Sequence, residues 1–323
     1  MFNFFKKTII AVHSGHFHAD DAFAVAVLRS VLTYDKSLGA GNVLVKRTRD
    51  ENWIARANYV VDVGRVYDAS KNRFDHHQQG GAGERDNGIP YAAFGLVWKH
   101  YGAHLCEIVF SQNKKTNMFA SRTNIELAVQ RIDEKLVQPI DAVDNGVAIV
   151  QEKFSDIRPY DITTIISGMN PEWNEKSDED DSTERFLTAV SLAEDVLIKE
   201  IQGAIRSIEA AEVAMNAYHA AEDKRLIIFD RYVPTSRVFA KLPEPLFVVY
   251  PQDSKWHIKA VKQNLSGFEN RKDLPLAWAG KVDEALEAAT GVKGAAFCHN
   301  KRFIAVAKTR EAILTMAKIA LEA

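Results

Sequence analysis

The sequence predicts an α/β fold in two domains: an N-terminal domain built on a parallel sheet and a smaller C-terminal α/β domain, joined by a long helix. Strand and helix signals alternate through the first half of the chain, which is typical of a parallel sheet. Good helix formers then continue almost unbroken from Phe186 to Asp223, and a second set of short strand signals follows. We therefore expect domains at residues 1–185 and 225–323 and a helical connector at 186–224.

Composition narrows the class of protein. The 323 residues are 46% hydrophobic and 26% charged, with a formal charge of −2, and this length suffices for two ordinary domains. The longest apolar runs, such as Leu226 to Phe229, are far shorter than the ~20 residues of a membrane helix. Two cysteines without CxxC spacing argue against a disulfide scaffold and a thiolate zinc site. Because the apolar stretch after Met1 soon meets polar His13, we expect no secretory signal, a cytoplasmic location and no membrane partner.

The N-terminal elements follow from short patterns. Runs at 8–12, 42–45 and 59–63 are β-branched or aromatic, as in buried parallel strands. Apolar residues at helical spacing begin after Asp20 and Asp21, whose charges favour a helix start. Another helix is expected from Tyr91 to His100, ended by Gly102. Between 170 and 184, seven acidic residues around one lysine predict a solvated loop.

The C-terminal domain combines strand signals with a basic segment. The expected elements are strands at 226–230, 246–250, 256–261, 295–298 and 303–307, and helices near 283–289 and 311–321. Residues 241–323 carry 13 basic and 9 acidic side chains, and no acid lies between Glu287 and Glu311. This last segment is either a phosphate-binding surface or the solvated basic face of a hairpin.

A first histidine cluster points to a metal. Five of the ten histidines lie in two N-terminal clusters. The first combines three imidazoles with two carboxylates where the first strand gives way to a helix: His13, His16, His18, Asp20 and Asp21. In open α/β sheets, ligands bind outside the carboxyl ends of strands. Carboxylates gathered there repel one another unless a cation compensates them, so we expect a metal site.

The second cluster, Asp75, His76 and His77, lies near another strand end, and Asp62 interrupts the apolar run from Tyr59 to Gly64. Asp144 follows in a later acidic segment, where its position alone suits a helix cap or turn. Mixed imidazole and carboxylate ligands suit two divalent ions, manganese first, with magnesium, zinc or cobalt as alternatives. Two such ions generate a hydroxide and stabilise a reacting phosphoryl group, so the sequence predicts phosphoester hydrolysis.

The tripeptide Asp75-His76-His77 resembles the motif that names the DHH phosphoesterase superfamily. Within it, the chain is similar to the melanocyte-proliferating-gene nuclease family, whose His-x-Gly-x-Phe-His-x-Asp pattern is matched by His13 to Asp20. Further matches follow in order along nearly the whole chain, at 61–64, 73–78, 88–91, 141–146, 168–171, 274–280 and 297–299. The resemblance implies a DHH-type catalytic domain followed by an accessory substrate-binding domain.

The resemblance also implies roles for individual residues. One ion would be held by His13, His18 and Asp62, and the other by Asp20, Asp62, His76 and Asp144. His77 would face the scissile phosphate with Asp75 supporting it, and the substrate phosphates would be received by Gly294, His299 and Arg310. His18 replaces an acid of the superfamily motif. One extra residue follows His13, so His16 is a rival leading ligand.

The function that this resemblance implies is a metal-dependent phosphodiesterase, specifically a 3′-to-5′ exonuclease acting on single-stranded RNA or short oligonucleotides. Two alternatives stay open: a phosphohydrolase of pyrophosphate or dinucleotides, and a non-catalytic metal or nucleotide sensor. A metal-dependent amide hydrolase is a more distant option. The sequence does not distinguish RNA from DNA, fix the metal, or separate a monomer from a homodimer.

Overall fold

The computed structural model describes residues 7–35, 38, 42–112, 121–151, 153–154, 157–176, 178–265 and 267–323. The chain divides into two compact units, residues 1–205 and 206–323. The division falls within the long helix α7 (Glu179–Ala220), inside the predicted connector. Each unit contains a five-stranded sheet among the described residues, so the mixed α/β fold is confirmed. The domain boundaries and the roles of the two units stay predictions.

The sheet of the first unit is parallel except for one outer strand. Its strands are β1 (Thr8–Val12), β2 (Val43–Arg47), β3 (Tyr59–Val61), β4 (Tyr67–Asp68) and β5 (Arg73–Phe74). They lie in the order β2-β1-β3-β5-β4, and only β4 runs antiparallel to its neighbour. Because β1, β3 and β5 are adjacent and parallel, their carboxyl ends meet at one edge of the sheet.

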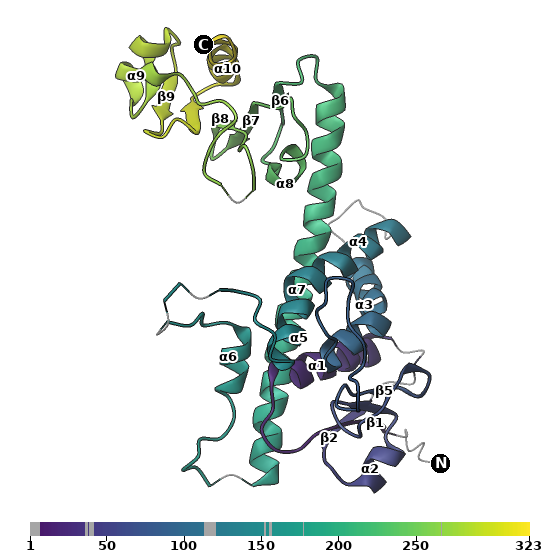
Figure 1. Cartoon of the computed structure of the whole chain (residues 1–323). Helices are drawn as coiled ribbons and strands as arrows, with labels where there is room; N and C mark the ends of the chain where they lie inside the picture. The colour runs from purple at the N-terminus through teal and green to yellow at the C-terminus, as the bar shows by residue number, and fades with distance from the viewer. Residues whose placement is uncertain are drawn as a thin grey trace. The chain divides into compact units, whose positions relative to one another are not determined.

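The first unit is rich in helices, which Figure 1 labels. They are α1 (Ala19–Tyr34), α2 (Glu51–Arg56), α3 (Ala93–Gln112), α4 (Arg122–Ile132), α5 (Gln138–Asp144), α6 (Ile162–Ser167) and α7, with the 3₁₀ helix η2 (Ala69–Lys71) and the π-helix η3 (Asp133–Val137). Helices α1 and α3 pack together through apolar faces, and the rings of Phe23 and Phe94 lie 5.1 Å apart. This core fixes the first turn of α1 beside the sheet.

Two local predictions were wrong. Helix α3 does not end at Gly102 but continues to Gln112. A Cβ on Gly102 would lie 2.7 Å from the ring of Trp98, so the glycine makes room for the indole within the helix. The acidic segment is not loop throughout, because α7 begins at Glu179. Acidic side chains in a first helical turn are stabilised by the positive end of the helix dipole.

The second unit has its own sheet and core. The strands are β6 (Leu226–Ile228), β7 (Phe247–Gln252), β8 (Lys255–Ala260), β9 (Ala295–Cys298) and β10 (Ile304–Ala307), in the order β6-β7-β8-β10-β9. The helices are α8 (Ser236–Phe239), α9 (Asp283–Thr290) and α10 (Arg310–Glu322), with the turn η4 (Leu276–Trp278). Only β6 and β7 pair in parallel. Each predicted strand and helix of this region is present, with ends shifted by a few residues.

Within the described residues, none of the helices combines the length and apolarity that a bilayer span needs.

Candidate metal centre

Three neighbouring strands bring the predicted ligands to one edge of the sheet. His13 directly follows β1, Asp62 follows β3, and Asp75 follows β5. The backbone N–H of Asp62 donates to the carbonyl of Phe74, 3.0 Å away, which holds the β3 and β5 ends together. Asp62 has φ 51°, a left-handed conformation that costs a residue with a Cβ about 1–3 kcal/mol. A strained conformation persists only where the surrounding structure holds it, and such residues cluster at functional sites.

Asp62 lies at the middle of this edge. Its Oδ2 is 3.4 Å from Nε2 of His13, and its Oδ1 is 3.4 Å from Nε2 of His76. The same Oδ1 lies 3.3 Å from Nδ1 of His77. The two oxygens of one carboxylate therefore face ligand atoms on opposite sides, as a bridging ligand requires.

The first turn of α1 supplies two further carboxylates. Oδ2 of Asp21 lies 2.8 Å from Nε2 of His13, while its Oδ1 accepts a hydrogen bond from the backbone N–H of His18. Asp20 is buried and accepts hydrogen bonds from the backbone N–H groups of Ala93 and Phe94, at 3.0 and 2.7 Å. Asp20 therefore caps the first turn of α3, where the helix dipole favours a negative charge.

Asp144, the last residue of α5, completes the centre. Its Oδ2 lies 3.1 Å from Nε2 of His76. Three groups of side chains bring ligand atoms within 4.8 Å of one another: His13, Asp21 and Asp62; Asp20, His76 and Asp144; and Asp62, His76 and His77. The first two groups correspond to two cation positions, with Asp62 between them.

The observed groups contain every predicted ligand except one. His18 belongs to none of the three groups, and Asp21 stands with His13 and Asp62 in its stead. The His18 side chain is exposed, with its ring centroid 6.1 Å from that of His13. The rival His16 is also exposed, and it lines a different cavity. A ligand role for His18 stays a prediction, while Asp21 is the candidate that the sequence analysis named in the cluster but left out of the ligand set.

The buried charges of this centre fit a cation. Three of the facing atoms, Asp21 Oδ2, Asp62 Oδ1 and His76 Nε2, are buried and have no partner with hydrogen-bond geometry among the described residues. Burial raises the pKa of Asp20 well above its usual value, and the charges of Asp144 and Asp62 raise it further. Buried carboxylates that gather in this way are electrostatically costly. Divalent cations on the facing atoms would remove that cost.

The imidazoles of His76 and His77 carry protons when no cation is bound. Burial lowers the pKa of His76, but the carboxylates of Asp144 and Asp62 outweigh it and raise the pKa to about 11. The carboxylate of Asp62 raises the pKa of His77 to about 9, although burial opposes it. The imidazolium of His76 thus partly compensates the carboxylates in place of a metal.

Metal binding should therefore release protons. A histidine binds a metal ion as the neutral imidazole, so a divalent ion has to displace the proton of His76. We expect the apparent affinity for manganese to rise about tenfold per pH unit for each proton released, from pH 6 to pH 8. Calorimetric titration in two buffers of different ionisation enthalpy measures the number of protons. An affinity that is constant across this pH range would contradict His76 as a ligand.

Behind the ligands lies a buried ion-pair network that sequence reasoning missed. Arg85 donates to Oδ2 of Asp141 at 2.7 Å and to Oδ1 of Asp133 at 2.8 Å, and its guanidinium lies 4.3 Å from the ring centre of Tyr91. Asp141 also accepts a hydrogen bond from the N–H of Gly95, where a Cβ would lie 1.9 Å from Asp141 Oδ2. Because Asp141 precedes Asp144 on α5, this network fixes the helix that presents Asp144.

The predicted phosphate-binding residues are only partly brought together. Gly294 precedes β9, and its carbonyl accepts a hydrogen bond from the N–H of Lys308, 2.8 Å away. Arg310 follows Lys308 by two residues, so the backbone of this segment lies near Gly294. Arg310 is exposed, and its guanidinium lies 5.7 Å from the ring centre of Trp256. His299 follows the other end of β9. A four-residue strand is about 13 Å long, so His299 is separated from the other two, and the substrate-binding role of all three stays a prediction.

The fold and these groups define a mixed α/β protein with a histidine–aspartate centre suited to divalent cations. A sequence model described as "Uncharacterised protein family (UPF0160)", for the MYG1 exonucleases, matches residues 9–321. The MYG1 protein of Dictyostelium discoideum is 32% identical over 95% of this chain and 94% of its own length. The human MYG1 exonuclease is 29% identical over 97% of this chain and 85% of its own length. The chain belongs to the MYG1 exonuclease family, whose members named as exonucleases indicate a family of nuclease hydrolases.

Proposed function

We propose that this chain is a metal-dependent 3′-to-5′ exonuclease acting on single-stranded RNA or short oligonucleotides, through a DHH-type centre with two cations, manganese first. Family membership supports a nuclease and therefore a nucleic acid substrate. The observation that carries the proposal is the position of Asp62, whose two oxygens face His13 on one side and His76 on the other. A buried carboxylate placed in this way is suited to bridge two ions.

The residues that would hold the ions are His13, Asp21 and Asp62 for one, and Asp20, Asp62, His76 and Asp144 for the other. His18, the ligand that the sequence predicts, is the alternative to Asp21. When bound, two such ions supply a hydroxide near neutral pH and neutralise charge that develops on the phosphoryl oxygens. Asp20 keeps its orientation through the two N–H groups of α3. The chain thus positions the ligands before any substrate arrives.

His77 is the candidate for contact with the scissile phosphate. Its Nδ1 lies 2.8 Å from Oδ1 of Asp75, which is itself buried and accepts from the N–H of Arg65. Asp75 thus fixes the ring of His77, while 57% of the His77 side chain is exposed. The part of the ring that Asp75 does not engage is therefore free to donate a hydrogen bond to a phosphoryl oxygen.

The test is hydrolysis of 5′-labelled single-stranded RNA in manganese, with matched DNA and pyrophosphate beside it. We expect the RNA to shorten stepwise from its 3′ end and the reaction to stop when the metal is chelated. Shortening from the 5′ end would contradict the polarity. Cleavage of pyrophosphate alone would reassign the centre to a small phosphohydrolase, and bound manganese without turnover on any of the substrates would indicate a sensor.

A further inference from the structure

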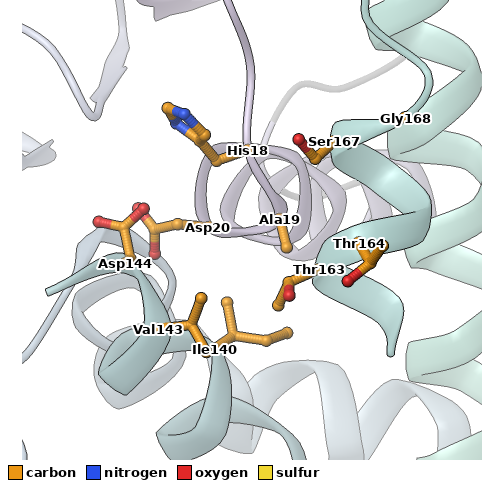
Figure 2. A pocket seen from close by; sticks show the side chains of 10 residues that line it. All are labelled: His18, Ala19, Asp20, Ile140, Val143, Asp144, Thr163, Thr164, Ser167 and Gly168. Carbon is orange, nitrogen blue, oxygen red and sulfur yellow. The ribbon is translucent and has the colours of Figure 1, made fainter. Parts of the chain in front are cut away.

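A cavity of about 640 Å³ lies beside the candidate metal centre, within the first unit. It is lined by the start of α1, the end of α5, and α6. Figure 2 shows the carboxylates of Asp20 and Asp144 together on one side of it, and Thr163 of α6 on another. Cavities of about 300–1,000 Å³ are typical of small-ligand sites. A molecule held here would have one end at the carboxylates of the metal centre.

The walls of the cavity are apolar on one side and hydroxylic on the other. Ile140 and Val143 form an apolar surface, while Thr163, Thr164 and Ser167 supply hydroxyl groups. The residues that line the cavity include no lysine or arginine. Away from the metal-centre end, where His18, Asp20 and Asp144 lie, a second phosphate group would find no basic side chain. An uncharged group with one apolar face and several hydroxyls would match both walls. A nucleoside has this chemistry, and pyrophosphate does not.

The hydroxyl wall is held in a fixed position. The hydroxyl of Thr163 donates to Oδ1 of Asp161 at 2.6 Å, which leaves its oxygen lone pairs as acceptors. Just beyond α6, the side-chain amide of Asn170 is bonded to both the N–H and the carbonyl of Phe17, at 3.0 and 2.8 Å. Phe17 precedes His18 in the loop that carries the first ligands. The hydroxyl acceptors are thus tied to the metal centre.

We propose that this cavity binds the nucleoside of the terminal ribonucleotide, with its base against Ile140 and Val143 and its ribose hydroxyls donating to the α6 hydroxyl wall. The inference rests on the proposed exonuclease function and deepens it, because a site for one nucleoside beside the metal centre selects a chain end. A ribose 2′-hydroxyl offers a donor that deoxyribose lacks. The cavity would therefore favour RNA over DNA.

Two variants test this inference. Val143→Trp fills the cavity, and Leu127→Trp, at a similarly exposed apolar position of α4, is its control. We compare kcat/KM for a single-stranded RNA oligonucleotide with that for methyl p-nitrophenyl phosphate, a phosphodiester without a nucleoside. We expect Val143→Trp to lower the ratio of the two values by about 10- to 100-fold, and Leu127→Trp to leave it unchanged. An unchanged ratio in Val143→Trp would overturn the inference.

Thr163→Val keeps the side-chain shape and removes the acceptor. We expect it to lower the preference for RNA over matched DNA by about 3- to 10-fold. Thr188→Val, an exposed threonine on α7, is the control. An unchanged preference would overturn the assignment of the ribose to this wall.

Binding separates this inference from the proposed function. Calorimetric titration with adenosine 5′-monophosphate in manganese should show weaker binding to Val143→Trp than to the wild type. If that difference appears while the wild type cleaves no phosphodiester, the cavity assignment stands and the exonuclease proposal fails. If the wild type cleaves RNA but both proteins bind the monophosphate equally, the cavity assignment fails and the exonuclease proposal stands.

Discussion

Asp62→Asn should reduce kcat/KM for RNA by about a thousandfold while the protein stays folded. The carboxylate faces His13 of one ligand group through Oδ2 and His76 of the other through Oδ1, and an amide cannot bridge two cations with two anionic oxygens. Loss of metal-ion catalysis costs several kcal/mol of transition-state stabilisation, and each 1.36 kcal/mol is tenfold in rate. The substitution keeps the side-chain volume, so the sheet edge retains its packing.

The controls for this variant separate ligand loss from unfolding. Asp195→Asn makes the same chemical change at an exposed position of α7, and we expect it to keep wild-type activity. Far-ultraviolet circular dichroism should be the same for all three proteins. Manganese should raise the melting temperature of the wild type and Asp195→Asn more than that of Asp62→Asn, because a ligand that binds only the folded state stabilises it. Turnover of Asp62→Asn within tenfold of the wild type would refute the assigned centre.

The convergence of the ligands could be predicted because it depends on local patterns. His13, Asp62 and Asp75 each follow an apolar strand signal, and the carboxyl ends of adjacent parallel strands must meet. The choice between His18 and Asp21 could not be predicted from the pattern. It depends on where α1 begins: His18 lies at its N-cap, so its N–H bonds to Asp21, while Oδ2 of Asp21 points to His13. A shift of one residue in a helix start changes which side chains face inward.

The supporting network could not be predicted because its partners are distant in sequence. Arg85 lies 48 residues before Asp133 and 56 before Asp141, and no local period links them. The predicted helix end at Gly102 was wrong for a related reason. Glycine often ends a helix, but here it lies against the ring of Trp98, a contact that the sequence pattern does not reveal. In the second unit, Gly294 and His299 are close in sequence, but β9 lies between them and holds them at opposite ends of the strand.

Arg85→Met should be the most destabilising of these substitutions. Arg85 is 9% exposed and Asp141 is fully buried. Removal of one partner of a buried ion pair typically costs about 3–5 kcal/mol, because the other partner stays buried without its counter-charge and hydrogen bonds. For a unit of this size that corresponds to a fall of about 10 °C in melting temperature. Arg122→Met removes an arginine whose side chain is 93% exposed and paired with Glu126, and we expect it to change the free energy of unfolding by less than about 0.5 kcal/mol.

The pH dependence of the stability lost in Arg85→Met tests whether the charge of Asp141 causes that loss. Burial raises the pKa of Asp141 to about 7 despite the opposing charge of Arg85, and without Arg85 the pKa is higher still. A carboxyl whose pKa is raised on folding stabilises the folded state at acid pH, and this contribution is lost as the pH rises toward the folded-state pKa. In the wild type this stabilisation stops falling near pH 7, where Asp141 has lost its proton. In Arg85→Met it continues to fall above pH 7, by about 1.4 kcal/mol per pH unit. Urea unfolding at pH 6, 7 and 8 should therefore show a deficit that is similar at pH 6 and 7 and larger at pH 8. A deficit that is the same at all three values would mean that Arg85 stabilises the unit through packing on Tyr91 and not through the charge of Asp141.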